Sequence, residues 1–429
     1  MTEPVERFVP TGPKWDAARK VATQLENAGY RAYFVGGCLR DGLLGRPIRD
    51  IDIATDAKPE AVLSLFPKAV PTGVQHGTVT VIVDGQSFEV TTFRQETGYR
   101  QHRWPQVTFV DDLHADLSRR DFTVNAMALG LDGRWYDPFD GLADLRRGQL
   151  RAVGDPNQRF TEDALRMLRA VRFAAQLNFQ IEPLTWAAIV EHASLLAAIS
   201  MERIQQELHR IMLSDRPDVG MRLLQESGLK KFIEPLAVIA DWSSEQFRWL
   251  RTVSVPASRW ALLFLYPPPD REALPQTIQE TEKRLRQLKY DRKLITTVKT
   301  LLRLYGALEE RNSWQRLFLD EQDEDVYEAI RLYAAVHQWP ENQLSAWLDA
   351  ATRAAEKLVI RHPKQMAIDG YDLQKAVGRP PGPWTGRLLR QLFEEVAFGQ
   401  LPNESSSLLN RAVALVRSDG SHGQGGGQM

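Results

Sequence analysis

Two aspartates separated by one residue, Asp50 and Asp52, are the strongest candidates for chemistry in this sequence. The apolar residues Ile51 and Ile53 alternate with them as in a β-strand, so both carboxylates are expected on the same face. Paired carboxylate oxygens are ligands that Mg²⁺ prefers. Cations held there would activate an attacking hydroxyl and neutralise a leaving pyrophosphate during in-line attack on an α-phosphate. Taken alone, the pair could also be a solvated turn at the edge of a strand.

A double glycine, Gly36-Gly37, lies shortly upstream of the acids, between a predicted strand at 30–35 and a predicted helix at 38–44. Backbone N–H groups at the start of a helix can hold phosphate oxygens where glycine leaves no side chain in the way. Arg40 would add a charged donor to the same phosphates. The alternatives are a plain turn and a surface cation. The strand–turn–helix–strand order nevertheless predicts that phosphates lie beside the metal.

Glu89 is the third acid of the predicted centre. The runs 78–83 and 86–93 are rich in β-branched residues and are joined by Asp84-Gly85, a pair typical of a two-residue type I′ turn. They predict a β-hairpin. Within it Glu89 lies between two apolar residues and therefore on the opposite face from them, where it could serve as a base or as an outer ligand of the metals.

The elements around these residues predict an α/β N-terminal third followed by a helical remainder. Residues 14–29 have helical apolar spacing, and from Thr161 onward the pattern is almost entirely helical. The last stretch, 418–429, is mostly Gly, Ser and Gln and is predicted to be disordered. The predicted helical segments of the second part are 162–177, 184–197, 200–213, 219–227, 277–304, 341–358 and 385–399.

The bulk composition limits the class of protein. A chain of 429 residues is too long for one core, and 43% apolar with 25% charged residues is typical of a folded globular protein. The one cysteine, Cys38, excludes an internal disulfide and a cysteine-based zinc site. No apolar run approaches the length that spans a bilayer, and the N-terminus carries acidic residues, so we expect a cytoplasmic protein with no membrane contact. The net charge of −1 requires any RNA binding to come from local basic clusters.

Five motifs in a fixed order resemble those of class II tRNA nucleotidyltransferases, which are the CCA-adding enzymes and their poly(A) polymerase relatives. The resemblance is clear over residues 30 to 230, and the segments at 369–373 and 382–384 resemble the end of the family's tail. The motifs are Gly36-Gly37-Cys38-Leu39-Arg40-Asp41, Asp50-Ile51-Asp52, His76-Gly77-Thr78-Val79, Arg119-Arg120-Asp121-Phe122-Thr123 and Glu162-Asp163-Ala164-Leu165-Arg166.

The resemblance implies an α+β fold, with an N-terminal nucleotidyltransferase head built on a small mixed five-stranded sheet and an all-α neck, body and tail. It also implies Mg²⁺ as the cofactor. The divisions that we predict are a catalytic head at 14–150, a neck with a nucleotide-selecting helix at 151–230, an RNA-binding helical body at 231–360, a helical tail at 361–417 and the disordered end at 418–429.

A predicted helix at 162–175 carries the residues that would choose the base. Asp163, Arg166, Arg169 and Arg172 recur every three residues and form a stripe on one side. Cytosine and adenine both show an exocyclic amine next to a ring-nitrogen acceptor, so an acceptor from Asp163 and a donor from Arg166 would match both, whereas uracil and guanine would mismatch. This resembles the family's use of a protein template. In an ordinary helix the same spacing would give a surface ion pair of little energetic weight.

Further nucleotide contacts are implied for other arginines. Arg169 and Arg172 would reach the sugar and the phosphates, and the resemblance implies that Arg120 contacts the nucleotide. Asp121 could orient that nucleotide, or it could cap the following helix. Segment 200–207 resembles the neck motif that supports the template helix.

A basic run around 283–303 is the predicted RNA-binding surface. Lys289, Arg292 and Lys293 are its central residues, and they could follow the phosphate backbone of the acceptor end and TΨC arm of a tRNA by shape. A solvated face is the alternative. The expected partners are thus tRNA, CTP and ATP, and nothing in the sequence points to an obligate protein partner.

Residues 94–106 are predicted to form a mobile loop, which in this family bears on the switch from C to A addition. The loop is near full length, but Trp104 stands where a second basic residue is usual beside Arg103. CCA addition is the predicted function. CC-only or A-only addition, a poly(A) polymerase, and a non-catalytic RNA-binding protein remain as alternatives.

Overall fold

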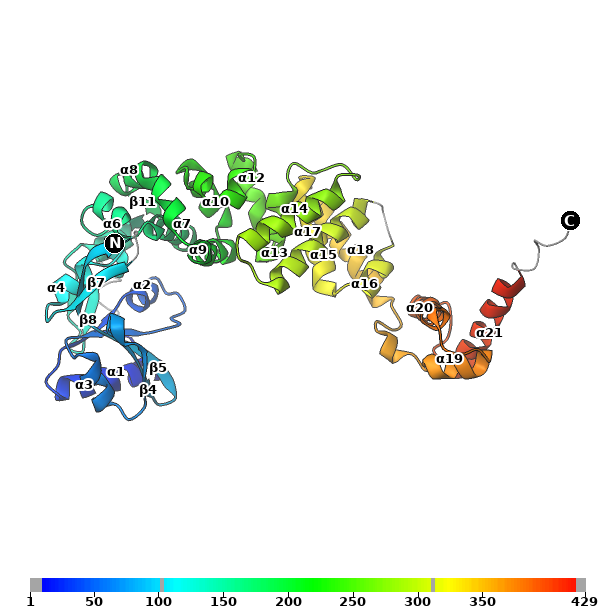
Figure 1. Cartoon of the computed structure of the whole chain (residues 1–429), viewed down its shortest axis with the longest axis horizontal. Helices are drawn as coiled ribbons and strands as arrows, with labels where there is room; N and C mark the ends of the chain where they lie inside the picture. Colours follow the sequence, from blue (N-terminus) through cyan, green and yellow to red (C-terminus); the bar gives the residue numbers. More distant parts are fainter. Residues whose placement is uncertain (1–9, 101–103, 310–312, 422–429) are drawn as a thin grey trace. The chain divides into compact units, whose positions relative to one another are not determined.

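The computed structural model describes residues 10–100, 104–309 and 313–421, and in this part of the chain seven strands form one mixed sheet (Figure 1). The strand order is β3-β4-β5-β2-β1-β8-β9. The strands of this sheet are β1 (Ala32–Val35), β2 (Asp52–Thr55), β3 (Ala69–Gly73), β4 (Thr78–Val83), β5 (Gln86–Thr92), β8 (Ala128–Gly130) and β9 (Trp135–Tyr136).

The mixed character of the sheet is confirmed, but the strand number differs from the five that we expected. β2 and β5 pair in parallel and the other pairs are antiparallel. The two additional strands are the edge strands β3 and β9, and β9 is only two residues long. They extend a five-stranded centre made of β4, β5, β2, β1 and β8.

The predicted hairpin is present as β4 and β5. Asp84 and Gly85 both have positive φ, 52° and 74°, as a type I′ turn requires. The alternate residues Phe88 and Val90 are buried in the core beneath the sheet, where α1 (Pro13–Asn27) and α3 (Pro59–Leu65) also contribute apolar side chains. The intervening Glu89 is exposed. Burial of one face thus leaves the acid on the other.

Helices lie before, between and after the strands of the sheet along the chain. The predicted helix at 162–175 is interrupted: α6 ends at Glu162, Asp163 has an extended backbone, and the next helix begins at Leu165. The helices up to residue 251 that are not named above are α2 (Gly37–Leu43), α4 (Leu113–Ser118), α5 (Gly141–Arg147), α6 (Pro156–Glu162), α7 (Leu165–Leu177), α8 (Pro183–His192), α9 (Met201–Leu213), α10 (Pro217–Glu226), α11 (Glu234–Ala237) and α12 (Ser244–Arg248), with 3-10 turns η1 (Val74–His76), η2 (Thr123–Asn125), η3 (Ala193–Ala198), η4 (Leu229–Phe232) and η5 (Trp249–Arg251).

The segment that we predicted as a mobile loop, 94–106, contains a two-stranded antiparallel ribbon instead. β6 (Arg94–Arg100) pairs with β7 (Trp104–Phe109), and residues 101–103 lie outside the described residues. Thr97 and Val107 are β-branched residues that favour strands, whereas the Gly, Gln and Arg content had indicated a loop. A further short parallel pair joins β10 (Gln149–Leu150) to β11 (Gln180–Ile181).

The chain divides into two units. Unit 1 comprises residues 1–251 with 284–290, and unit 2 comprises 252–283 with 291–429. The finer division into head, neck, body and tail stays a prediction. The helices of the second half are α13 (Pro256–Leu265), α14 (Leu274–Gln287), α15 (Arg292–Glu309), α16 (Trp314–Asp320), α17 (Asp323–Val336), α18 (Glu341–Glu356), α19 (Gly370–Val377), α20 (Pro383–Ala397) and α21 (Ser405–Ser421), with the 3-10 turn η6 (Pro363–Gln365).

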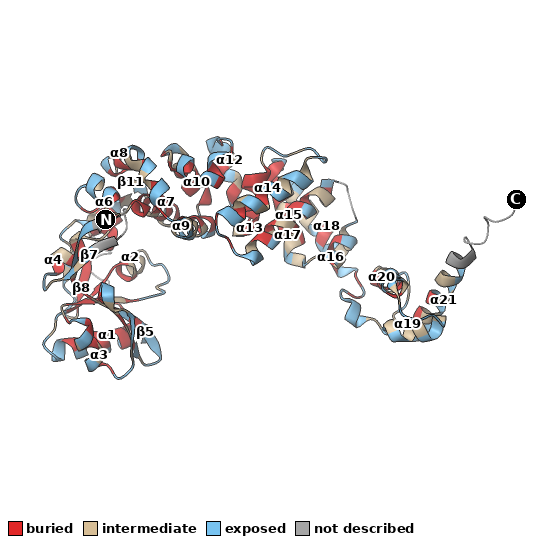
Figure 2. Cartoon of the chain, in the orientation of Figure 1, coloured by how far each residue is buried: buried red, intermediate tan, exposed pale blue. Residues whose placement is uncertain are grey.

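Unit 2 has an apolar core formed by its helices. The buried residues of α13, α15 and α17, drawn in red in Figure 2, include Trp260, Leu301 and Ile330. The predicted helix at 277–304 is in fact two helices, because Lys289 adopts a positive φ of 63° that no α-helix contains. The predicted disordered end is helical in its first part, since α21 runs to Ser421, and 422–429 lie outside the described residues.

Within the described ranges, no helix is both long and apolar enough to cross a membrane.

Candidate active site

Two of the three predicted acids lie on paired strands, and the third lies just before one of these strands. Asp52 is the first residue of β2 and lies opposite Glu89 of β5 in the parallel register. Asp50 precedes the strand and is exposed, and its carboxylate lies 3.9 Å from the Lys14 ammonium. The structure therefore brings the other two carboxylates near Asp52.

The carboxylate of Asp52 lies near two other negative charges, those of Glu89 and Asp50. Burial, the charge of Glu89 and that of Asp50 raise the pKa of Asp52 to about 6, although Arg120 opposes this shift. No cluster of three acidic, His or Cys side chains fit for a metal occurs in the described residues. Mg²⁺ is typically held by one or two carboxylates together with substrate phosphates. The hard oxygen donors of Asp50 and Asp52 fit a cation of that kind.

Gly36 and Gly37 lie directly beside the acids. Gly36 has φ 78°, and a Cβ added there would lie 3.2 Å from Arg120 Nη1 and 3.5 Å from Asp52 Oδ2. The backbone conformation and the lack of space both require glycine. Gly37 opens α2, and a Cβ there would meet the Arg40 guanidinium at 3.4 Å. The double glycine therefore leaves open the space between the acid and two arginines.

Arg40 and Arg120 are fixed by hydrogen bonds within unit 1. Arg40 is buried and donates to Asp41 and, at 2.5 Å, to Asn125 Oδ1. Arg120 Nη2 donates to Asp116 at 3.2 Å, and its Nε is buried with no hydrogen-bond partner in the described residues. A buried donor without a partner is costly, and a bound anion would satisfy it.

One cavity of about 590 Å³, the central cavity, brings most of the predicted residues together. It contains residues of the glycine turn, of β2, of the ribbon β6–β7 and of helix α7. Neither Asp50 nor Glu89 lines it. The lining residues are Gly36, Gly37, Arg40, Asp52, Arg94, Glu96, Arg119, Arg120, Asp121, Asn125, Asp163, Leu165, Arg166, Arg169, Arg172, Phe173, Arg203 and Arg210.

Asp163 and Arg166, the residues predicted to select the base, are held in place by other side chains. Asp163 precedes α7, accepts the Leu165 N–H at 3.1 Å and forms an ion pair with Arg203 at 2.8 Å. Arg166 is buried and donates to Glu162 at 3.0 Å and to the Arg119 carbonyl at 2.8 Å. Both side chains line the central cavity with restricted freedom, as base recognition requires.

Arg169 and Arg172, which follow on α7, each face a carboxylate. Arg169 Nε donates to Asp121 at 2.8 Å. Burial opposes ionisation of Asp121, yet Arg169 and Asn125 outweigh it and hold the pKa of Asp121 below its usual range. Arg172 forms a buried ion pair with Glu207 of α9, and burial lowers the pKa of Arg172 to about 10.

Several lining residues were given no role by sequence reasoning. Asn125 follows the fourth motif by two residues and connects Arg40 to Asp121. Arg203 lies in the segment that we assigned only to neck support, and its Nη1 is buried without a partner in the described residues. Glu96 accepts from Arg94 and Arg119 at the base of the ribbon. The only feature of the sequence that could have identified these lining residues is their closeness to the motifs along the chain.

The predicted RNA-binding residues are exposed. Lys289 lies in the turn between α14 and α15, and Arg292 and Lys293 open α15. By contrast, Lys299 of the same basic run is paired with Glu282.

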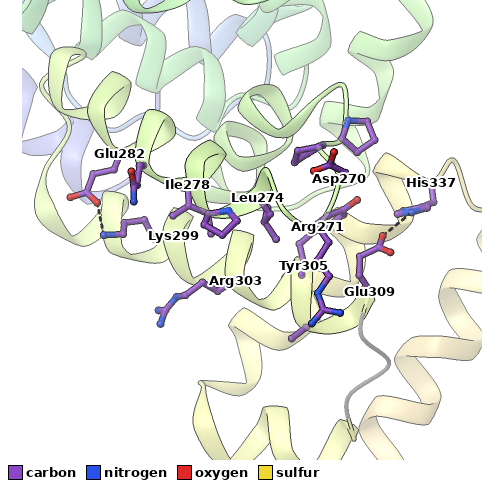
Figure 3. Close-up of a pocket in the computed structure, with 16 residues that line it drawn as sticks. Asp270, Arg271, Leu274, Ile278, Glu282, Lys299, Arg303, Tyr305, Glu309 and His337 are labelled. Atoms are coloured by element: carbon purple, nitrogen blue, oxygen red, sulfur yellow. Dashed lines mark hydrogen bonds and ion pairs between the residues drawn. The ribbon is translucent and has the colours of Figure 1, made fainter.

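A cavity of about 1100 Å³ in unit 2 is lined by Lys299 and Arg303 of the basic run but by none of the predicted catalytic or nucleotide-binding residues (Figure 3). Two of its carboxylates face basic side chains of the same cavity: Glu282 pairs with Lys299, and Glu309 lies 3.1 Å from His337. Its proline and leucine side chains add an apolar wall. These paired charges do not converge on a common point, in contrast to the central cavity.

Comparisons with known proteins agree with the motifs. The family model described as the poly A polymerase head domain matches residues 32–151. A model described as a probable RNA- and SrmB-binding site of polymerase A matches 178–238. The model described as a putative tRNA nucleotidyltransferase domain 2 matches 271–412.

Relatives match nearly the whole chain. The CCA-adding enzyme of Limosilactobacillus reuteri is 37% identical over 94% of this chain and 97% of its own length. The enzyme of the same description from Pediococcus pentosaceus is 40% identical over 95% and 99%. The crystal structure of the Bacillus stearothermophilus CCA-adding enzyme in complex with CTP is 34% identical, with a TM-score of 0.81 over 96% of this chain and 100% of that one. The chain belongs to the family of CCA-adding enzymes, the tRNA nucleotidyltransferases.

Proposed function

We propose that this chain adds CMP and AMP, from CTP and ATP, to the 3′ end of tRNA and so completes or repairs its CCA terminus. The observation that carries the proposal is the central cavity, whose walls join the glycine turn and Asp52 to Asp163 and Arg166. A space of about 590 Å³ suits one nucleotide with its triphosphate. The full-length similarity to CCA-adding enzymes supports the same activity.

The triphosphate lies between the glycine turn and the arginines. Gly36 and Gly37 leave room for its oxygens next to Asp52, and Arg40 and Arg120 supply charged donors. The unpartnered Nε of Arg120 gains an acceptor when the phosphates bind. These groups orient the α-phosphate toward the acids, so much of the barrier is removed by positioning.

A divalent cation belongs to the chemistry of this family, and Mg²⁺ held by Asp50 and Asp52 is our specific assignment. When bound, the metal supplies polarisation of the attacking hydroxyl and charge neutralisation of the leaving pyrophosphate. The 3′ oxygen of the RNA forms a bond to the α-phosphorus as the bond to pyrophosphate breaks. Glu89, exposed and paired in register with Asp52, is placed to take up the proton or to support the ligands.

Base choice depends on Asp163 and Arg166. The ion pair with Arg203 keeps Asp163 an acceptor, and Arg166 is a permanent donor. This pair matches the amine and the ring nitrogen of both cytosine and adenine, and it disfavours uracil and guanine because buried groups would lose their partners. Arg169 and Arg172 flank the sugar and phosphates.

The RNA end approaches from an adjoining cavity of about 680 Å³ that shares Asp52 with the central cavity and also contains Asp50. Its wall carries Arg46 and Arg49, both exposed. Farther along the RNA, the exposed Lys289, Arg292 and Lys293 neutralise backbone phosphates of the acceptor end and TΨC arm. This mode of binding reads the shape of the RNA more than its sequence.

The test is incorporation of labelled CTP or ATP, with Mg²⁺, into tRNAs that lack the CCA end, that stop after the second C, or that are complete. CCA addition extends both truncated tRNAs and leaves complete tRNA unextended. Extension by C alone or by A alone identifies a specialist, repeated A addition identifies a poly(A) polymerase, and no incorporation identifies a non-catalytic RNA-binding protein.

The matched variants test the acid assignment. Asp50→Ala and Asp52→Ala should each abolish incorporation, whereas Glu60→Ala should leave it unchanged, because Glu60 is an exposed carboxylate on α3 of the same unit. Persistence of activity in Asp52→Ala would refute the metal assignment.

A further inference from the structure

Asn125 lies between two arginines that come from different parts of unit 1. It closes the 3-10 turn η2 and is buried at the wall of the central cavity. Its Oδ1 accepts from Arg40 Nη1 at 2.5 Å, and its Nδ2 donates to Asp121 Oδ1 at 3.0 Å. Asp121 Oδ2 in turn accepts from Arg169 at 2.8 Å. One continuous chain of hydrogen bonds thus joins α2 to α7.

The Asn125 amide suits this position because it accepts from one neighbour and donates to the other. A guanidinium presents donors alone and a carboxylate presents acceptors alone, so the group between Arg40 and Asp121 must accept on one side and donate on the other. A carboxylate would face Asp121 with like charge, and an alkyl group would leave two buried partners unsatisfied. The orientation of the amide is therefore fixed by its neighbours.

The two ends of this chain lie on different helices at the wall of the central cavity. Arg40 lies at the glycine turn, on the phosphate side, and Arg169 lies on the helix that carries Arg166. A second contact reinforces the link, because the guanidinium groups of Arg40 and Arg169 lie 4.9 and 5.5 Å from the centre of the Phe173 ring.

We infer that Asn125 is a positioning residue that couples base selection to phosphate alignment. The amide fixes the separation between Arg40 and α7. A nucleotide with the correct base therefore has its α-phosphate aligned with Asp52, whereas a mismatched base displaces it. The inference rests on the function proposed above. It adds that Asn125 determines specificity without touching the base.

The test compares Asn125→Ala with Asn125→Asp in the full-length chain, with kcat/KM measured for CTP and UTP on a tRNA that lacks the CCA end. Asn125→Ala removes both hydrogen bonds and should lower the CTP-to-UTP ratio of kcat/KM at least about tenfold, because Arg40 and α7 are then no longer linked through a buried amide. Asn125→Asp keeps the bond to Arg40 and loses the bond to Asp121. It should lower the same ratio, and it should raise the KM for CTP less than Asn125→Ala does.

Asn157 offers a matched control, since it is a hydrogen-bonded but exposed asparagine of the same unit outside the central cavity. Asn157→Ala and Asn157→Asp should leave the ratio unchanged. A purely structural role would lower activity with both nucleotides equally, so an unchanged ratio in a folded Asn125→Ala variant overturns the inference. If that variant does not fold, an unchanged ratio in Asn125→Asp does so. Asp52→Ala tests the proposed function separately, because the loss of incorporation expected in that variant does not depend on the hydrogen bonds of Asn125.

Discussion

Unit 1 buries more charged side chains than unit 2, and some of them line its central cavity. Among the described residues, two charged side chains of unit 2 are buried, Arg259 and Glu328, whereas unit 1 buries nine. The nine are Arg40, Asp116, Asp121, Asp144, Arg166, Arg172, Glu207, Asp218 and Lys230.

This difference indicates which buried residues are kept for the function of the protein and not for its stability. A buried ion pair costs desolvation free energy that an apolar pair would not cost, so stability alone does not favour it. In unit 1 four of the buried charged residues line the central cavity, and each is held by a polar partner, as Arg172 is held by Glu207. The four are Arg40, Asp121, Arg166 and Arg172. In unit 2 apolar side chains from α13, α15 and α17 form the core, and most charged side chains lie at the surface, several of them in ion pairs such as that of Arg390 with Glu394.

The largest expected effect is a loss of stability when the buried ion pair of Arg172 and Glu207 is broken. Arg172→Ala should lower the free energy of unfolding by about 3–5 kcal/mol, because buried Glu207 then keeps only the more distant Arg210, at 3.6 Å, as an ion-pair partner in the described part of the chain. Urea unfolding measures the loss. The matched variant in unit 2 is Arg390→Ala, which removes exposed ion pairs and should cost about 1 kcal/mol or less. Equal losses would remove the contrast between the two units.

The next effect concerns the apolar core of unit 2. Leu301→Ala, at a fully buried position on α15, should cost about 2–5 kcal/mol of stability through the cavity it leaves. The kcat for CTP should be unchanged at temperatures where the variant is folded, because the chemistry lies in unit 1. A kcat that falls in the folded protein would show that unit 2 also shapes the reaction.

A smaller effect is predicted for base choice. Asp163→Ala removes the acceptor for the base amine and frees Arg203. The preference for CTP over UTP, measured as the ratio of kcat/KM values, should fall about 10- to 100-fold, which corresponds to about 1.4–2.7 kcal/mol. Glu182→Ala is the control and should affect stability alone, because Glu182 caps the start of α8 and does not line the central cavity. An unaltered ratio in Asp163→Ala would contradict the template assignment.

The smallest effect concerns RNA binding. Replacing Lys289 and Arg292 together by Ala should raise the KM for tRNA about 3- to 10-fold at low salt, with the KM for CTP unchanged. Because two phosphate contacts are lost, the variant should depend less steeply on salt than the wild type, and the two proteins should converge at high salt. Parallel salt dependences would show that these cations do not contact RNA.

Local signals predicted the elements of the site well. The positive φ angles at Asp84 and Gly85 follow from that residue pair, and the glycine turn follows from Gly36 and Gly37. The interruption at Asp163 was missed, because its three-residue spacing to Arg166 also fits a continuous helix. The spacing carries no information about the cap that Asp163 itself provides.

Contacts between distant residues could not be predicted from spacing. Arg203 reaches Asp163 and Glu207 reaches Arg172 across intervals of 40 and 35 residues, and only the packing of α9 against α7 brings them together. The ribbon at 94–109 was missed for a related reason, since its composition indicated a loop and its strand pairing depends on partners within the fold.

The short segment 284–290 decides how separable the two units are. It belongs to unit 1 although the chain on both sides belongs to unit 2, and it buries Leu285, Leu288 and Tyr290. The Tyr290 ring lies 5.9 Å from His209 of α9. A chain cut after Arg251 would keep every predicted catalytic residue and yet leave a gap in its own core. Each unit is built from two separate stretches of the chain. A chimera of two relatives joined at one point therefore cannot take a whole unit from either of them.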